Sequence, residues 1–180
     1  MPKWKIITSQ NIVNNYYCKV TKEKVLTNKG KIISDYFLIS HRDVVMIVPI
    51  TKLGKFNLIK EYKHGVKKEI FLFPAGLIKD KESPKEAAIR ELKEETGFYT
   101  ENIEYLGELY EFPSNETQKV FIYLAKNLPE KPNQKKDPNE ETKLYQFNTN
   151  DFKKLIIKNK IKLATTISAF FMAINKSNKK

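Results

Sequence analysis

Runs of apolar residues along the chain predict a sheet whose central strands are buried on both faces. Residues 44–50 (VVMIVPI) form a continuous apolar run, and residues 120–125 form a second one. Runs of this length are typical of strands that are covered on both faces. Further strands are predicted over residues 56–62, 103–112 and 144–147.

Helical spacing of apolar residues predicts two helices near the end of the chain. Thr149 or Asn150 is expected to cap a helix over residues 151–157, and a second helix is expected over residues 164–174. The residues at core spacing in the second helix are Ile167, Phe170, Phe171 and Ile174.

The part of the chain before the first apolar run predicts a small antiparallel β segment. Residues 20–26 alternate between apolar and polar side chains, residues 27–30 (TNKG) give a turn signal, and residues 31–39 resume an extended pattern. We therefore expect three parts: a β-rich N-terminal segment (1–41), a main domain (42–176) and a short tail (177–180).

Residues 84–96 carry the signals of a helix with defined ends. Ser83 and Glu86 have the spacing of a capping box, and Pro84 suits the first helical position. Gly97 stands where a left-handed residue ends a helix. The segment therefore predicts about three turns of helix.

Three carboxylates fall on one side of this helix. Glu91 lies three residues before Glu94 and four before Glu95, so all three project within reach of one ion. Like charges at this spacing repel, and Arg90 can offset only Glu94 or Glu86. A hard cation with oxygen ligands, Mg²⁺ or Mn²⁺, would balance the rest. The alternative interpretation is a solvated acidic helix face.

The spacing of residues 76–98 resembles the Nudix box at each defining position. The pattern reads Gly76, five residues, Glu82, seven residues, Arg90-Glu91-Leu92, one residue, Glu94-Glu95, one residue, Gly97-Phe98. The resemblance implies a Nudix hydrolase of the α/β (α+β) class. Such a protein is an α/β/α sandwich with a mixed sheet that uses metal ions to cleave a diphosphate bond in a nucleoside diphosphate linked to another group.

Residues on both sides of the box resemble the ADP-ribose pyrophosphatase branch of this family. The Pro-Ala-Gly entrance implies that the Ala75 carbonyl is a metal ligand, and a backbone oxygen suits a hard cation. Pro113, about fifteen residues after the box, resembles a mark of the branch, although it also suits a simple turn. Glu116 matches an acidic position that lies near the metals and the substrate in this branch.

The polar, proline-containing loop over residues 128–142 ends in residues 137–141 (DPNEE), which resemble the acidic loop that supplies a general base in these enzymes. Glu140 is favoured for this role over Glu141, and a loop carboxylate beside a metal-activated water is chemically sensible. The alternative is that both only solvate a mobile loop. Two departures concern the pocket: Lys63 replaces the usual Arg and is a candidate phosphate contact, and Leu72 replaces a frequent Glu.

These observations predict Mg²⁺-dependent hydrolysis of ADP-ribose to AMP and ribose 5-phosphate. In this interpretation Glu91, Glu95 and the Ala75 carbonyl hold the metals, Glu94 contributes to the cluster, and Arg90 orients its carboxylates. Alternatives are another sugar nucleotide such as GDP-mannose, a dinucleoside polyphosphate, capped RNA, or a non-catalytic nucleotide-binding module.

The basic charge of the chain is weak support for a nucleic-acid partner. The formal net charge is +12, but Arg42 and Arg90 are the only arginines. Surfaces that grip phosphate usually include bidentate arginine, so we attribute the lysine excess to compositional bias. Nucleic acid is therefore not an expected partner.

Location and assembly follow from the remaining signals. The apolar runs are too short for a membrane span, and Cys18 is the only cysteine, so we expect a cytoplasmic protein without membrane partners. The N-terminal β segment resembles one that commonly packs across a homodimer in this branch and helps to form the substrate pocket. A homodimer is expected, with a capping hairpin on a monomer as the alternative.

Overall fold

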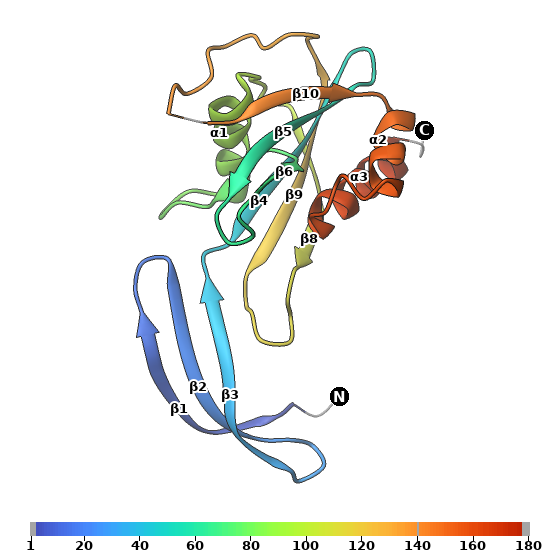
Figure 1. Cartoon of the computed structure of the whole chain (residues 1–180). Helices are drawn as coiled ribbons and strands as arrows, with labels where there is room; N and C mark the ends of the chain where they lie inside the picture. The colour runs from blue at the N-terminus through green and yellow to red at the C-terminus, as the bar shows by residue number, and fades with distance from the viewer. Residues whose placement is uncertain (1–2, 140, 178–180) are drawn as a thin grey trace. The chain divides into compact units, whose positions relative to one another are not determined.

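The computed structural model describes residues 3–139 and 141–177 (Figure 1). The chain divides into two compact units, each of which is described by itself. One comprises residues 1–43 and 110–119, and the other comprises residues 44–109 and 120–180. The expected division at residues 41 and 42 stays a prediction.

The first unit contains a three-stranded antiparallel sheet in the order β1-β2-β3. Its strands are β1 (Lys5–Asn14), β2 (Cys18–Leu26) and β3 (Ile32–His41). The predicted hairpin is present as β2 and β3, and its turn includes Gly30 with a φ of 79°. The sequence did not predict β1, in which the register shifts twice, between Ile6 and Thr8 and between Asn11 and Val13. These irregularities fall where two apolar residues are adjacent, so the usual alternation is lost.

Residues 110–119 pair with β3 inside the same unit. The Ile39 amide donates to the Asn115 carbonyl at 2.7 Å, and the Thr117 amide donates to the Ile39 carbonyl at 3.2 Å. Glu116 forms a parallel bridge with Ile39 between these two bonds. The turn that contains Pro113 is thereby fixed to the third strand.

The second unit is organised around a seven-stranded mixed sheet in the order β10-β5-β4-β9-β8, with β6 beside β5 and β7 beside β4. The central pair β4 and β9 is parallel, whereas β5 and β7 run antiparallel to β4. Two of the strands contain the predicted apolar runs. The bounds are β4 (Val44–Thr51), β5 (Phe56–Lys63), β6 (Lys68–Leu72), β7 (Ala75–Leu77), β8 (Ile103–Tyr110), β9 (Lys119–Leu128) and β10 (Lys143–Phe147).

Helices cover both faces of this sheet, as Figure 1 shows. They are α1 (Pro84–Thr96), α2 (Thr149–Ile157) and α3 (Ala164–Ser177). Val45 and Ile47 of β4 pack in one core cluster with Leu92 of α1. Met46 and Val48, which point to the opposite face, pack in the other cluster with Phe152 of α2 and Phe170 of α3. The expected α/β/α sandwich is confirmed.

Two details of the C-terminal helices differ from the sequence prediction. The cap of α2 is Asn148, whose side chain accepts from the Asp151 amide at 2.8 Å, so the helix begins at Thr149 rather than Asp151. In α3, Phe170 is fully buried whereas Phe171 is 43% exposed, because adjacent helical residues face different directions. None of the helices in the described ranges combines the length and apolar character needed to cross a bilayer.

Candidate active site

The helix α1 has the predicted signals at both ends. The Ser83 side chain accepts from the Glu86 amide, and the Ser83 amide donates to the Glu86 carboxylate at 2.8 Å, which completes a capping box. Gly97 ends the helix with a φ of 74°, and its amide donates to the Lys93 carbonyl. These contacts fix the start and the end of the segment that carries the acidic cluster.

A short strand before the helix brings backbone against two of the predicted metal ligands. β7 pairs with β4, with Met46 opposite Ala75. The Ala75 amide donates to Glu95 Oε2 at 2.9 Å. A Cβ on Gly76 would lie only 2.0 Å from Glu91 Oε1. The Ala75–Gly76 backbone therefore contacts both carboxylates, and the absence of a side chain at residue 76 makes the approach of Glu91 possible.

Arg90 joins the loop before the helix to the carboxylates on it. Its guanidinium donates twice to Glu82, from Nε at 2.7 Å and from Nη2 at 2.9 Å. It also donates from Nη1 to Glu91 Oε1 at 2.5 Å and to Glu94 Oε2 at 2.9 Å, and from Nη2 to the Leu77 carbonyl at 3.0 Å. These bonds match the five N–H groups of arginine, so its donors already serve to orient the cluster.

The charges of this network stabilise one another. The hydrogen bond from Arg90 holds the pKa of Glu82 below its usual value, and the Lys79 amide, which donates to Glu82 Oε2 at 2.9 Å, adds to the effect. The same bond to Glu82, supported by Glu91 and Glu94, raises the pKa of Arg90. Glu82 therefore links the loop to the helix as a carboxylate.

The burial of the carboxylates does not fit the alternative of a solvated acidic face. Glu91 is 8% exposed and Glu95 is 5% exposed, whereas Glu94 is half-buried. Ionised carboxylates are rarely buried unless they are paired or bind a cation. Arg90 and the Ala75 amide supply part of this compensation.

The donor set suits a hard divalent cation. Glu91 and Glu95 offer carboxylate oxygens beside the backbone of Ala75 and Gly76, and oxygen ligands are those that Mg²⁺ prefers. Within residues 3–139 and 141–177, no three side chains of the His, Cys, Asp and Glu types are gathered to hold a metal by themselves. A cation would therefore need a backbone carbonyl or substrate oxygens as well, which is usual for Mg²⁺.

The loop between β9 and β10, which carries the two candidate bases, contacts the end of α1. The Asp137 amide donates to the Glu94 carbonyl at 3.0 Å, and the Gln134 amide donates to the Gly97 carbonyl at 2.9 Å. Glu141 is exposed and directly precedes the buried Thr142. Glu140 lies outside the described residues, so its role as the base stays a prediction.

The predicted substrate contacts lie in both units. Lys63, at the end of β5, forms an ion pair with Glu61 at 2.7 Å. Pro113 and Glu116 belong to the first unit, in the segment that pairs with β3. Their roles in substrate binding stay predictions.

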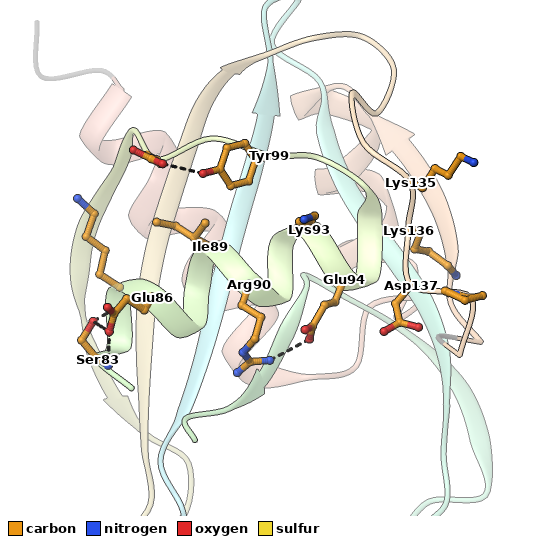
Figure 2. A pocket seen from close by; sticks show the side chains of 13 residues that line it. Ser83, Glu86, Ile89, Arg90, Lys93, Glu94, Tyr99, Lys135, Lys136 and Asp137 are labelled. Carbon is orange, nitrogen blue, oxygen red and sulfur yellow. Dashed lines mark hydrogen bonds and ion pairs between the residues drawn. The ribbon is translucent and has the colours of Figure 1, made fainter. Parts of the chain in front are cut away.

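An open groove of about 960 Å³ runs along the outer side of α1 (Figure 2). In Figure 2, Ser83 and Glu86 lie at one end and Asp137 at the other. Neither Glu91 nor Glu95 lines this groove, so it is not the candidate metal centre, although Arg90 and Glu94 border both. Its lining residues are Ser83, Lys85, Glu86, Ile89, Arg90, Lys93, Glu94, Tyr99, Glu101, Lys135, Lys136, Asp137 and Pro138.

No pattern in the sequence indicated that Lys136 and Thr142 belong to the site. Lys136 Nζ donates to the Thr142 carbonyl at 2.6 Å, and the Thr142 hydroxyl donates to the Glu95 carbonyl at 2.9 Å. A threonine directly after an acidic loop carries no signal of such a contact, because its partner lies 47 residues away.

Comparison with known proteins finds one matching family model and several similar proteins. Residues 40–166 match the model of the NUDIX domain. A methanol dehydrogenase activator from Bacillus methanolicus is 30% identical over 129 residues, which span 72% of this chain and 69% of the relative. An ADP-ribose pyrophosphatase from Bacillus subtilis is 27% identical over 69% of this chain and 66% of its own length.

A third relative and a solved structure extend this comparison. The ADP compounds hydrolase NudE from Escherichia coli is 42% identical over 89 residues, which span 49% of this chain and 47% of the relative. The crystal structure of an ADP compounds hydrolase superposes with a TM-score of 0.80 at 26% identity and covers 97% of this chain and 94% of its own chain. The sequence similarity is partial in length, whereas the structural similarity spans nearly the whole chain.

Proposed function

Because the chain belongs to the Nudix hydrolase family, we propose that it hydrolyses ADP-ribose to AMP and ribose 5-phosphate with the help of Mg²⁺. Hydrolysis of a nucleoside diphosphate sugar is supported by the relatives named ADP-ribose pyrophosphatase and ADP compounds hydrolase. The observation that carries the proposal is the position of Glu91 and Glu95 against the Ala75–Gly76 backbone.

The reaction adds one water across the diphosphate. The water oxygen bonds to one phosphorus, the bridging oxygen leaves with the other phosphate, and a base takes the proton of the water. A loop carboxylate, Glu140 or Glu141, is proposed as this base. Arg90 keeps Glu91 and Glu94 oriented and, with its donors engaged by protein oxygens, leaves the substrate charge to other groups.

Nudix hydrolases generally use divalent metal ions, and the oxygen donors of this site suit one. Glu91, Glu95 and the Ala75 carbonyl would hold the cation, with Glu94 beside them. When bound, Mg²⁺ or its substitute Mn²⁺ would neutralise the diphosphate charge and acidify the attacking water.

Substrate contacts outside the cluster are proposed from the resemblance. Lys63 would meet a phosphate, and Glu116 and Pro113 would line the substrate pocket. We expect these three residues to contribute to the preference for ADP-ribose over GDP-mannose or a dinucleoside polyphosphate.

The first unit supports a homodimer. Every residue of β1 is exposed, including Ile6 at 56% and Ile12 at 49%. Phe37 on β3 and Trp4 before β1 are exposed as well. Apolar groups gathered on one small sheet mark an interaction surface, and a second copy of the chain is the proposed partner. Light scattering should give twice the mass of one chain, and Ile12→Lys should shift the protein toward the monomer.

A cytoplasmic location is also proposed, because Cys18 is the single cysteine of the chain and forms no disulfide within it.

A substrate panel tests the proposed function. ADP-ribose, GDP-mannose, UDP-glucose, NADH, diadenosine polyphosphates and capped RNA are each incubated with Mg²⁺ or Mn²⁺, and a phosphatase releases countable phosphate from the products. We expect the highest kcat/KM for ADP-ribose. A clear preference for another compound would contradict the substrate, and no turnover of any compound with either ion would contradict hydrolysis itself.

A further inference from the structure

The last turn of α1 is completed by another segment of the chain. The final carbonyls of a helix have no partner within it and must be satisfied from outside. In α1, the Glu94 carbonyl accepts from the Asp137 amide at 3.0 Å, and the Glu95 carbonyl accepts from the Thr142 hydroxyl at 2.9 Å. The loop after β9 is thus bound to the backbone of two residues whose side chains belong to the acidic cluster.

Thr142 is the centre of this contact. It is 8% exposed, and its hydroxyl donates to Glu95 while accepting from Lys136 Nζ at 3.0 Å. Lys136 also donates to the Thr142 carbonyl at 2.6 Å. Lys136, which directly precedes Asp137, is therefore bonded to Thr142, and both Asp137 and Thr142 are bonded to the backbone of α1.

We propose that Lys136 and Thr142 are positioning residues that hold Glu141, one of the two candidate bases, at a fixed distance from the metal-binding carboxylates. The inference rests on the proposed function, in which a loop carboxylate takes the proton of the attacking water. Neither residue is proposed to touch the reacting atoms. Both act through the backbone to which the carboxylate is attached.

These bonds affect the candidate base Glu141 because it is the direct neighbour of Thr142 in the sequence. Glu141 is adjacent to Thr142, so its Cα lies about 3.8 Å from that of Thr142. The Thr142 hydroxyl in turn lies 2.9 Å from the carbonyl of Glu95. If Thr142 moves, the carboxylate of Glu141 therefore moves relative to α1. Misplacement by about 1 Å costs roughly a hundredfold in rate when the geometry of attack is demanding.

Substitutions at Thr142 separate positioning from packing. Thr142→Val keeps the shape of the side chain and removes the hydroxyl, whereas Thr142→Ser keeps the hydroxyl. We expect Thr142→Val to lower kcat by roughly tenfold to a hundredfold, with KM and the Mg²⁺ concentration for half-maximal activity within about threefold of the wild type. Thr142→Ser should restore kcat to within about twofold, and the acidic limb of the pH profile of kcat should change only in Thr142→Val.

Two neighbouring lysines supply a matched control. Lys136 is half-buried and bonds to Thr142, whereas Lys135 is exposed beside it in the wall of the groove (Figure 2). Both Lys136→Met and Lys135→Met remove one positive charge. We expect only Lys136→Met to lower kcat. Equal losses in the two variants would indicate an effect of charge and would overturn the inference.

Further results would support or overturn the positioning role of Thr142 and Lys136. A Thr142→Val protein with kcat within twofold of the wild type and a lower melting temperature would show that the bonds only stabilise the fold. If the wild type prefers another compound of the panel, the same ratios are measured with that compound. If it hydrolyses none, the proposed function fails. In that case hydrogen exchange at the Asp137 amide at least tenfold faster in Thr142→Val keeps the positional claim, and unchanged exchange overturns it.

Discussion

The carboxylate of Glu91 occupies the space that a side chain at Gly76 would fill. A Cβ built on Gly76 would lie 2.0 Å from Glu91 Oε1 and 2.5 Å from Oε2. The glycine therefore serves close approach, not backbone freedom, since its φ is not among the positive values that the structure records for glycine.

Gly76→Ala should abolish most of the activity with little loss of stability. The added methyl group meets the end of a flexible side chain, so Glu91 can rotate away while β7 and α1 keep their places. Displacing a metal ligand should lower kcat/KM for ADP-ribose by about a hundredfold or more. Steady-state kinetics and the melting temperature measure the two effects separately.

Gly65→Ala is the matched control for this substitution. A Cβ at Gly65 meets nothing within 4 Å, and its φ is not positive. We expect normal kinetics from this variant. Normal kinetics from Gly76→Ala as well would mean that the position of Glu91 does not matter for turnover.

Arg90→Lys should lower kcat by roughly tenfold or more, because an ammonium cannot reproduce the fork that bonds Glu82, Glu91 and Glu94 together. The loop that carries Glu82 should also become more accessible to proteases. In a double-mutant cycle with Glu82→Gln the two losses should be less than additive, because both break the same contact. Fully additive losses would contradict a shared role.

The pH dependence of stability should include a contribution from Glu82. Its pKa is lowered in the folded protein by Arg90, so the folded state binds this proton less readily than the unfolded state. The stabilisation is therefore fully present above the ordinary carboxyl pKa of about 4.3 and is lost as pH falls through the lower folded value. The difference in melting temperature between wild type and Glu82→Gln should shrink from pH 7 to pH 3. A constant difference would argue against the linkage.

The apolar pattern was sufficient to predict the central layers of the fold. The runs in β4 and β9 are buried on both faces, and alternate residues point to α1 or to α2 and α3, as parallel central strands require. β1 could not be found in this way, because its residues are exposed and its two irregularities interrupt the alternation. The cap of α2 at Asn148 was missed because three consecutive residues, Asn148 to Asn150, are all suitable caps.

The candidate site was predictable as far as local spacing determines it. The capping box, the end of the helix at Gly97 and the contact between Arg90 and Glu94 all follow from helical periodicity. The bond between Arg90 and Glu82 and the contact of Thr142 with Glu95 depend on how a loop folds back on the helix, which no spacing encodes. The burial of Glu91 and Glu95 depends on the pairing of β7 with β4.

The turnover of ADP-ribose by Glu95→Gln with saturating Mg²⁺ tests most directly whether the acidic cluster on α1 is the catalytic metal centre. The amide oxygen can still accept from the Ala75 amide, so the fold should persist while a charged oxygen ligand is lost. Glu86→Gln is the control on the same helix, because glutamine also completes a capping box. We expect kcat to fall at least about a hundredfold in Glu95→Gln and to stay normal in Glu86→Gln. Near-normal turnover by a folded Glu95→Gln protein would contradict the assignment of this cluster as the metal-dependent catalytic centre.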